Sequence, residues 1–405
     1  MCLIICFRKR NIAMENTDKQ MRDDLRLAIM ALCQPVLTIF QGLLIGYGVT
    51  SADNSTIVRA VLSALLVFTA LPVILKRKPD LFFISYIIVG LLVFLEWLCF
   101  PVNRPLIISN SVRFIFPILI PSFLAIPCMK YPIEALNKGL LIISWLIIIE
   151  TVFFVIIMLF PHSLEMEYDM GTGFSILVAA IYCITKQDFK YYLISFGLTI
   201  VILLFCSRSP ILAIAIFAVY YFFIEKRKSK MAILLMPVLI LIVVLIKPIL
   251  LYTQSLGLDS RTISMFLEGD IESASGRDFI YPIVIKGLED NPILGVGIYG
   301  DRLLYPSDNI STAYPHNLFL EILVQYGVFF GSIFIIVIFL PIFRIWRIKQ
   351  DYRILFMVIA IGCLVPLIFS GSYLVSPLFA TYMGFCYFIN RNRKVLKVAK
   401  QKNLK

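Results

Sequence analysis

Long apolar runs alternate with short polar breaks along almost the whole chain of 405 residues. Many of these runs contain roughly 17 to 25 residues, the length that a helix needs to cross a bilayer core of about 30 Å. About twelve such runs can be marked, near 27–49, 57–75, 81–101, 105–127, 139–161, 170–185, 189–206, 208–224, 231–252, 317–343, 352–370 and 372–389. The pattern predicts an all-α polytopic membrane protein with about twelve transmembrane helices.

Composition supports this fold class. Hydrophobic residues make up 60% of the chain, charged residues only 15%, and the mean hydropathy is +0.91. These values lie far from the balance of a soluble globular domain, so that class is excluded.

One hydrophilic interval, from about Tyr252 to His316, is much longer than any other. A connection of this length inside a compact protein usually has a function. Apolar residues recur at helical spacing from Asp278 to Glu289, which predicts an amphipathic helix on the membrane surface. We therefore divide the chain into a leader, nine spans, a large loop with this helix, three further spans and a basic tail, at 1–26, 27–252, 253–316, 317–389 and 390–405.

The net charge of +12 is unevenly distributed. Lys and Arg collect in alternate short loops, as the positive-inside rule predicts for cytoplasmic loops. Such clusters include Arg8–Arg10, Lys76–Lys78, Lys226–Lys228 and the stretch after Arg391, whereas the intervening turns carry almost no positive charge. The pattern predicts that both termini are cytoplasmic and that the large loop faces outward. The charge thus indicates topology and contact with membrane lipids, and it does not indicate a nucleic-acid partner.

Within the large loop, acidic residues outnumber the basic residues Arg261, Arg277, Lys286 and Arg302. This balance excludes a general cationic surface, so individual arginines must hold any anion there. Arg277 is the best placed of them, because Gly276 allows close approach of the backbone.

Charged residues inside the predicted spans lie mainly toward the outer ends. A charge in hydrocarbon is costly, so such residues are functional candidates unless they reach the interface or pair with one another. Their asymmetry favours an outward-opening polar cavity over the path through the whole bilayer that a transporter needs. The outer set is Arg59, Glu96, Arg113, Arg208, Lys247 and Glu321, and Glu150 lies nearer a midpoint.

The segment Ser207-Arg208-Ser209-Pro210 forms a polar break between two apolar runs. Pro210 suits the first turn of a helix, where its missing amide costs nothing. A helix N-terminus beside Arg208 is a ready site for phosphate. The alternative is a tight turn whose arginine meets lipid headgroups.

His316 is one of only two histidines and lies where the large loop meets the next span. Histidine is the side chain best suited to accept a proton near neutral pH. Asn317 follows it, and Glu321 lies on the same helical face as Asn317. A lone histidine at a helix start is also often an interfacial or capping residue, and that alternative stays open.

No pattern in the sequence indicates a metal or cofactor site. The nine cysteines are scattered, none lies in the large loop, and none pairs with a histidine at ligand spacing. No phosphate-binding glycine loop of the P-loop type is present. The glycines between Asn291 and Gly300 are interpreted as a plain turn rather than as a ligand contact.

Several short motifs, in their order and spacing, resemble the O-antigen ligase and polymerase superfamily. They are Ser207-Arg208-Ser209, Gly276-Arg277, Asn291-Pro292-Ile293-Leu294-Gly295-Val296-Gly297, His316-Asn317, Glu321 and Gly327. The resemblance implies a GT-C-like glycosyltransferase of the bacterial inner membrane. It implies a glycan donor on undecaprenyl diphosphate and a lipid-linked glycan acceptor at the outer face, with no nucleotide or metal.

The resemblance also implies residue roles. Arg208 and Arg277 match arginines that hold the diphosphate, and His316 matches the histidine that activates the acceptor hydroxyl. Two guanidinium groups suit the charge on a leaving diphosphate. The candidates for substrate binding are Arg113, Asn317, Glu321 and Arg302.

We interpret the chain as a polymerase that joins oligosaccharide repeat units of a capsule, exopolysaccharide or O-antigen. The alternative is a ligase that transfers the finished polymer to lipid A core or another acceptor. A polysaccharide transporter or flippase is a further alternative, as is a scaffold without catalytic arginines. A flippase and a chain-length regulator are the expected protein partners of a polymerase.

Overall fold

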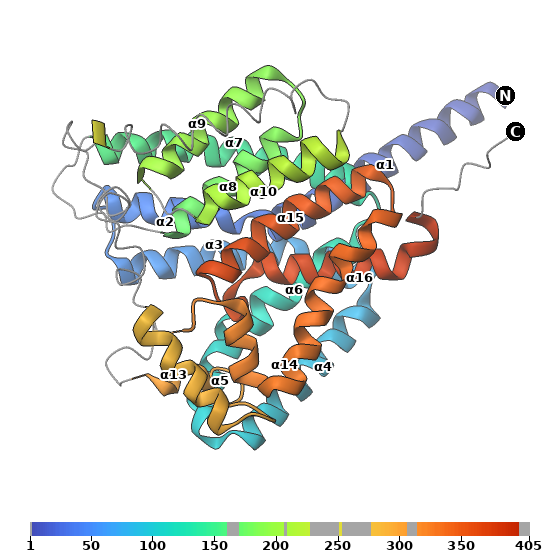
Figure 1. The fold of residues 1–405 in the computed structure, drawn as a ribbon. Coiled ribbons are helices and arrows are strands. Elements are labelled where there is room, and N and C mark those ends of the chain that lie inside the picture. The colour runs from blue at the N-terminus through green and yellow to red at the C-terminus, as the bar shows by residue number, and fades with distance from the viewer. Residues whose placement is uncertain are drawn as a thin grey trace, which may run out of the picture.

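The structure is a computed structural model that describes residues 2–159, 170–205, 209–226, 251–252, 277–305 and 314–396. All regular elements of these residues are helices. Figure 1 shows that most helices form one bundle, against which a group containing α4, α5, α13 and α14 is tilted. The first helix begins and the last helix ends on the same side of the bundle. The all-α fold class is therefore confirmed.

The chain begins with two helices that meet at a sharp bend. Helix α1 covers Cys2–Leu32 and α2 covers Gln34–Gly46, with Cys33 between them. The two directions differ by 54°, because Pro35 in the first turn of α2 has no amide to continue the α1 ladder. Helix α1 runs without interruption across residue 26, where the leader was expected to end.

Two long helices follow. Helix α3 spans Ala52–Arg77, and the Ser51 side chain caps its start by accepting from the Asn54 amide at 3.4 Å. Lys78 then separates it from α4, Pro79–Cys99, which begins on the proline. Both helices are apolar enough to cross a membrane.

The span expected at 105–127 lies within Pro101–Cys128, one of the helices long and apolar enough to cross a membrane, and it consists of short helical pieces. Pro117, Pro121 and Pro127 each remove a backbone donor, which breaks a regular α-helix into segments. The pieces are η1 (Pro101–Asn103), α5 (Arg104–Asn110), the π-helix η2 (Ser111–Leu119), α6 (Ile120–Ala125) and η3 (Ile126–Cys128).

The centre of the bundle is helix α8, Met170–Ile184. It packs against α2, α7, α9, α10 and α15. Ala179 and Ala180 are fully buried, and their small side chains allow these helices to approach closely. The neighbours in sequence are α7 (Pro132–Leu159), α9 (Phe189–Phe205), α10 (Ser209–Val219) and η4 (Tyr220–Glu225).

The carboxyl-terminal part contains one shorter helix, α13, and three long ones. The predicted amphipathic segment corresponds to α13, Arg277–Asp290, which packs against α14. The remaining elements are η6 (Gly300–Leu304), α14 (Leu318–Arg344), η8 (Ile345–Arg347), α15 (Gln350–Phe369), η9 (Tyr373–Val375) and α16 (Pro377–Leu396).

The expected count of twelve spans is not confirmed. Among the residues described, 6 helices are long and apolar enough to cross a membrane, and the bent pair of α1 and α2 makes up to 7. Helices 171–184, 189–204 and 209–225 are apolar but shorter. Most of the ninth expected span, 231–252, lies outside the described residues.

Helix α14 is broken at Gly327, which has φ 72° and ψ 174°. In a continuous helix the Val328 amide would donate to the Val324 carbonyl. Here it donates to the Pro292 carbonyl at 2.8 Å, and the freed carbonyls of Val324 and Gln325 accept from the amides of residues 296 and 297 at 2.8 and 3.0 Å. The segment 291–297 therefore pairs with a helix break.

This pairing corrects the interpretation of the glycine-rich motif as a plain turn. Backbone groups freed inside a membrane protein must find partners within the protein. A Cβ atom on Gly295 would lie 2.5 Å from the Gln325 backbone, and one on Gly327 would lie 2.2 Å from the Ile293 carbonyl oxygen. The two glycines are needed because the two segments touch backbone to backbone.

Candidate functional site

Three side chains converge on the turn that follows α15. The Arg277 guanidinium donates from Nη2 to the Phe369 carbonyl oxygen at 2.5 Å. The next carbonyl oxygen, that of Ser370, accepts from the Tyr314 hydroxyl and lies 3.2 Å from His316 Nδ1. The start of α13 and the approach to α14 are thus joined at one short turn, which brings Arg277 and His316 together.

The contact with Ser370 defines the protonation pattern of a neutral His316. A carbonyl oxygen only accepts hydrogen bonds, so Nδ1 carries the proton. Nε2 then has its lone pair available and is the atom that can take a proton from a hydroxyl. The Tyr314 ring lies against the imidazole, with ring centroids 3.9 Å apart, and holds its plane.

The backbone at His316 is in the left-handed region, with φ 52°. Asn317 then returns to an extended conformation, and its side-chain oxygen accepts from the amides of Phe319 and Leu320 at 3.0 and 3.2 Å. This N-cap explains why α14 begins at Leu318.

The surroundings keep His316 neutral over a wider pH range. Burial lowers its pKa below the usual value, the hydrogen bond to Ser370 opposes this, and the nearby Arg277 charge lowers the pKa further. Burial also raises the pKa of the Tyr314 hydroxyl, which stays protonated as a donor to Ser370. The arrangement favours a proton acceptor over an imidazolium.

A buried polar network lies behind this turn. Ser372 donates to Oε1 of Glu321, which is fully buried. One turn further along α14, Gln325 donates to Asp301 Oδ1 at 2.6 Å and accepts from the Tyr373 hydroxyl at 2.5 Å. The network ties the first turns of α14 to both η6 and the segment after α15.

The neighbouring residues Asp301 and Arg302 complete the network. Burial raises the pKa of Asp301 to about 6, against the opposing effects of Gln325 and Arg302. The Arg302 guanidinium is only 9% exposed and lies 5.1 Å from the centre of the Tyr299 ring. In the part of the chain that the structure describes, Arg302 Nε, Asp301 Oδ2 and Glu321 Oε2 have no hydrogen-bond partner. These side chains are enclosed between η6 and the first turns of α14.

Helix α4 and η1 fix the other side of the glycine-rich segment. The Ile298 amide donates to Glu96 Oε2 at 3.1 Å. The Asn103 side chain donates to the carbonyls of Val296 and Ile298 at 2.8 and 3.3 Å. Glu96, expected as a charge lining an outer cavity, therefore binds backbone.

Of the three residues predicted to be catalytic, the structure describes two. Arg277 and His316 are brought together, whereas Arg208 lies outside the described residues. Arg113 is exposed on η2, a π-helix that packs against η9 just after the convergent turn.

The other predicted binding residues have structural contacts. Asn317 caps α14, Glu321 accepts from Ser372, and Arg302 is enclosed. Glu321, which was expected to line an outward-opening cavity, is fully buried, and Arg302 is only 9% exposed. Arg59 donates to the side chains of Gln41 and Gln34, both at 3.1 Å.

Sequence reasoning missed the residues that orient the histidine. Tyr314 lies two positions before His316, a spacing that puts the two rings in contact only because of the tight backbone between them. Ser370 and Ser372 belong to a turn that the sequence marked only by its lack of charge. Of the residues described, no group of three or more His, Cys, Asp or Glu is arranged to hold a metal ion.

A family model matches part of this chain. Residues 193–335 match the family model described as O-Antigen ligase. The matched segment includes Arg208, Arg277, the paired glycine motif and His316, and it ends before the convergent turn at 369–370. No curated protein matches the chain.

Proposed function

We propose that this chain, whose residues 193–335 match the O-antigen ligase family model, is a polysaccharide repeat-unit polymerase. It transfers a glycan from undecaprenyl diphosphate to a lipid-linked acceptor at the outer face of the bacterial inner membrane. Both termini are cytoplasmic in this proposal. The observation that supports it best is the meeting of Arg277 and His316 at the turn after α15.

His316 acts as the general base. Its Nδ1 proton is engaged with Ser370, so Nε2 accepts the proton of the acceptor hydroxyl as that oxygen attacks the anomeric carbon of the donor. A new glycosidic bond to the acceptor oxygen forms while the bond between the anomeric carbon and the diphosphate oxygen breaks. The electron pair of the broken bond leaves with the undecaprenyl diphosphate.

Arg277 stabilises the leaving diphosphate. Nη2 of Arg277 donates to the Phe369 carbonyl, and this hydrogen bond fixes the plane of the guanidinium. The other nitrogen atoms of the guanidinium are the donors to the diphosphate in this proposal. A fixed donor aimed at developing charge is worth more than a mobile one, because it needs no reorganisation during the reaction. Arg208 supplies the second guanidinium in this proposal, on the resemblance of its motif.

The genetic test is deletion of the gene followed by electrophoresis of the surface glycan. A polymerase predicts loss of long chains with single repeat units still attached. Polymer accumulating on the lipid carrier would identify a ligase instead. Absence of lipid-linked units from the outer face would identify a flippase.

The site is tested separately with Arg208→Ala, Arg277→Ala and His316→Ala. Each variant should lose long chains while its membrane level stays normal. Lys286→Ala is the matched control for Arg277→Ala, because Lys286 is an exposed cation on the same helix, α13. Wild-type chain lengths in any of the three variants would remove that residue from the mechanism.

A further inference from the structure

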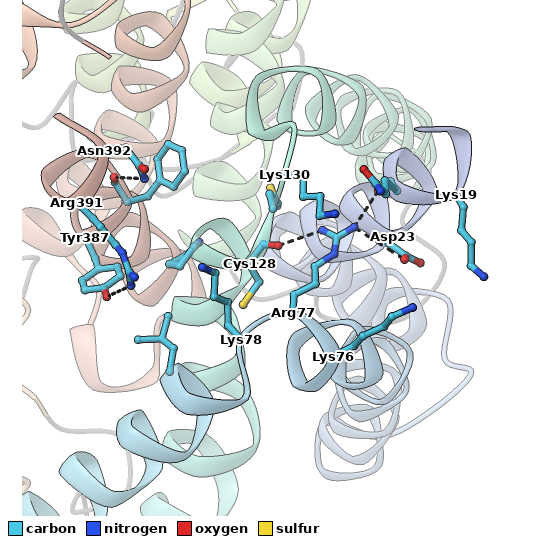
Figure 2. A pocket seen from close by; sticks show the side chains of 15 residues that line it. Lys19, Asp23, Lys76, Arg77, Lys78, Cys128, Lys130, Tyr387, Arg391 and Asn392 are labelled. Carbon is cyan, nitrogen blue, oxygen red and sulfur yellow. Dashed lines mark hydrogen bonds and ion pairs between the residues drawn. The ribbon is translucent and has the colours of Figure 1, made fainter. Parts of the chain in front are cut away.

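A cavity of about 660 Å³ opens where α3 ends and α4 begins (Figure 2). Its walls come from α1, from the junction of α3 and α4, from the segment after η3 and from the last turns of α16. The cavity is lined by six basic side chains and one carboxylate, that of Asp23. The basic residues are Lys19, Lys76, Arg77, Lys78, Lys130 and Arg391.

This basic cavity lies far from the candidate active site. Helix α16 begins at Pro377, shortly after the convergent turn, and Arg391 in the cavity lies 14 residues further along it. At 1.5 Å per residue the separation is about 20 Å. Helix α15 runs in the opposite direction, from the Arg353–Glu225 ion pair to Phe369 at the convergent turn. The cavity is therefore at the opposite end of the bundle.

The floor of the cavity is a preformed ionic structure. Arg77 contacts the fully buried carboxylate of Asp24 and donates to the carbonyls of Cys128 and Gln20 at 3.0 and 3.1 Å. Asp24 also accepts from the Tyr131 amide at 2.7 Å. Figure 2 shows Arg77 between Cys128 and Asp23, with Lys76, Lys78 and Lys130 around it. The Arg77 charge is thus already compensated by protein.

The lysines are not compensated in this way. Lys76, Lys78 and Lys130 form no ion pair with any carboxylate in the ranges that the structure describes. Grouping cations in a concave site with low-dielectric walls focuses a positive potential that attracts anions. The excess positive charge in the cavity therefore favours binding of an anionic ligand from outside the chain.

The remaining walls are apolar or aromatic. Leu81, Pro127, Met129 and Phe388 line the cavity together with Tyr387, whose hydroxyl accepts from Arg391 at 2.9 Å. A free phosphate would use the cations and leave this surface unused. A phosphate that carries hydrocarbon would use both.

We propose that the basic cavity binds the headgroup of an anionic phospholipid, with the phosphodiester on Lys76, Lys78 and Lys130 and the glycerol and first acyl carbons on the apolar wall. Basic pockets between membrane helices on the positively charged side of a protein suit such headgroups. The positive-inside rule assigns this end of the bundle to the cytoplasmic leaflet. The site is independent of the glycan chemistry at the other end.

The experiment measures binding of dioctanoyl phosphatidylglycerol to the full chain in nonionic detergent by native mass spectrometry, with dioctanoyl phosphatidylcholine and inorganic phosphate in parallel. The test variant combines Lys76→Gln, Lys78→Gln and Lys130→Gln. It leaves Arg77 and Asp24 intact, so the floor of the cavity and the fold are retained. The readout needs no enzymatic turnover, so its result is separate from that of the proposed function.

The matched control combines Arg344→Gln, Arg347→Gln and Lys349→Gln. These exposed residues lie at the same end of the bundle, where α14 ends and α15 begins, but they do not line the cavity. At about 1 kcal/mol for each basic residue, the test variant should bind the anionic lipid roughly a hundredfold more weakly. The control should bind as the wild type does, within about threefold.

Three results would overturn the proposal. Equal weakening in test and control variants would mean general surface charge rather than a site. Equal binding of phosphatidylcholine and phosphatidylglycerol would remove the role of the negative charge. Lysine-dependent binding of inorganic phosphate as tight as that of phosphatidylglycerol would make this a free-phosphate site and exclude the lipid.

Discussion

His316 Nδ1 lies 3.2 Å from the carbonyl oxygen of Ser370, a residue in the turn between α15 and η9. This contact selects the imidazole tautomer whose Nε2 is free to accept a proton. It also joins the large loop to the last part of the bundle. The base in the proposed reaction is therefore oriented by backbone rather than by the carboxylate often found behind a catalytic histidine.

The first prediction concerns pH. His316 must be neutral to act as a base, and its pKa is lowered by burial and by Arg277. The transfer rate should therefore stay constant down to below pH 6.5, near the usual histidine pKa, and fall only as the pH drops through the lowered value. The measurement is the initial rate of polymer formation by purified protein against pH. An acid limb centred above pH 6.5 would contradict the assignment.

The second prediction couples the two residues. In Arg277→Gln the positive charge beside His316 is lost, so the histidine pKa should rise and the acid limb of the residual rate should move to higher pH. The rate itself should fall about a hundredfold or more, because a donor to the developing charge is lost. Arg277→Lys keeps the charge and should leave the acid limb in place. Identical acid limbs in the Gln and Lys variants would disprove the coupling.

The third prediction tests Glu321 as a positioning residue. Glu321→Gln keeps the oxygen that accepts from Ser372, whereas Glu321→Leu removes it and leaves a buried hydroxyl without its partner. We expect the Gln variant to keep most of the transfer rate. The Leu variant should lose about 1 to 3 kcal/mol of unfolding free energy, and its maximal rate should fall more than its KM changes. Inactivity of the Gln variant would show that the negative charge itself is needed.

The fourth prediction concerns the helix break. A Cβ on Gly327 would lie 2.2 Å from the Ile293 carbonyl oxygen, in a backbone region that residues other than glycine rarely adopt. Gly327→Ala should therefore lower the unfolding free energy by about 3 kcal/mol or more. The control is Gly90→Ala in α4, because a Cβ there meets nothing within 4 Å. Thermal unfolding in detergent compares the two, and equal midpoints would refute the paired-break description.

The fifth prediction addresses the buried ion pair. Asp24→Asn leaves the Arg77 charge without its closest partner and should cost about 3 to 5 kcal/mol of unfolding free energy. Asp23→Asn is the matched control, since Asp23 is 22% exposed and lies 3.9 Å from Arg77. That change should cost about 1 kcal/mol or less. Unfolding temperatures that rank the two variants the other way round would contradict this description.

Local signals predicted individual elements well where a single helix explains the pattern. The apolar runs at 57–75 and 81–101 correspond to α3 and α4. Where several local preferences compete, the sequence predicted the span, which lies within the candidate span Pro101–Cys128, but not the pieces that build it. The run at 105–127 has the length and hydropathy of one helix, yet its prolines divide it into pieces that include a π-helix.

The glycine motif makes a long-range contact that no local signal predicts. Its glycines indicated a turn, but no local rule states that the turn pairs with the backbone of the next long helix, as the amides of Val296 and Gly297 do with Val324 and Gln325. That pairing depends on Gly327 breaking α14 and on Glu96 and Asn103 supporting the other side. These contacts join segments far apart along the chain, whereas the periodicity of apolar residues reports only on local structure.

By itself, the sequence determined the class of protein, because the thickness of a bilayer sets the length and hydropathy that a membrane-spanning helix needs. It also determined which chemical groups were candidates, since few residues other than arginine and histidine suit phosphate binding and proton transfer near neutral pH. Only the tertiary structure decided that Arg277 and His316 meet, and that they meet at Phe369 and Ser370. Every residue has a backbone carbonyl oxygen, so the sequence does not show which one orients the histidine. Only the fold brings the Ser370 carbonyl to His316.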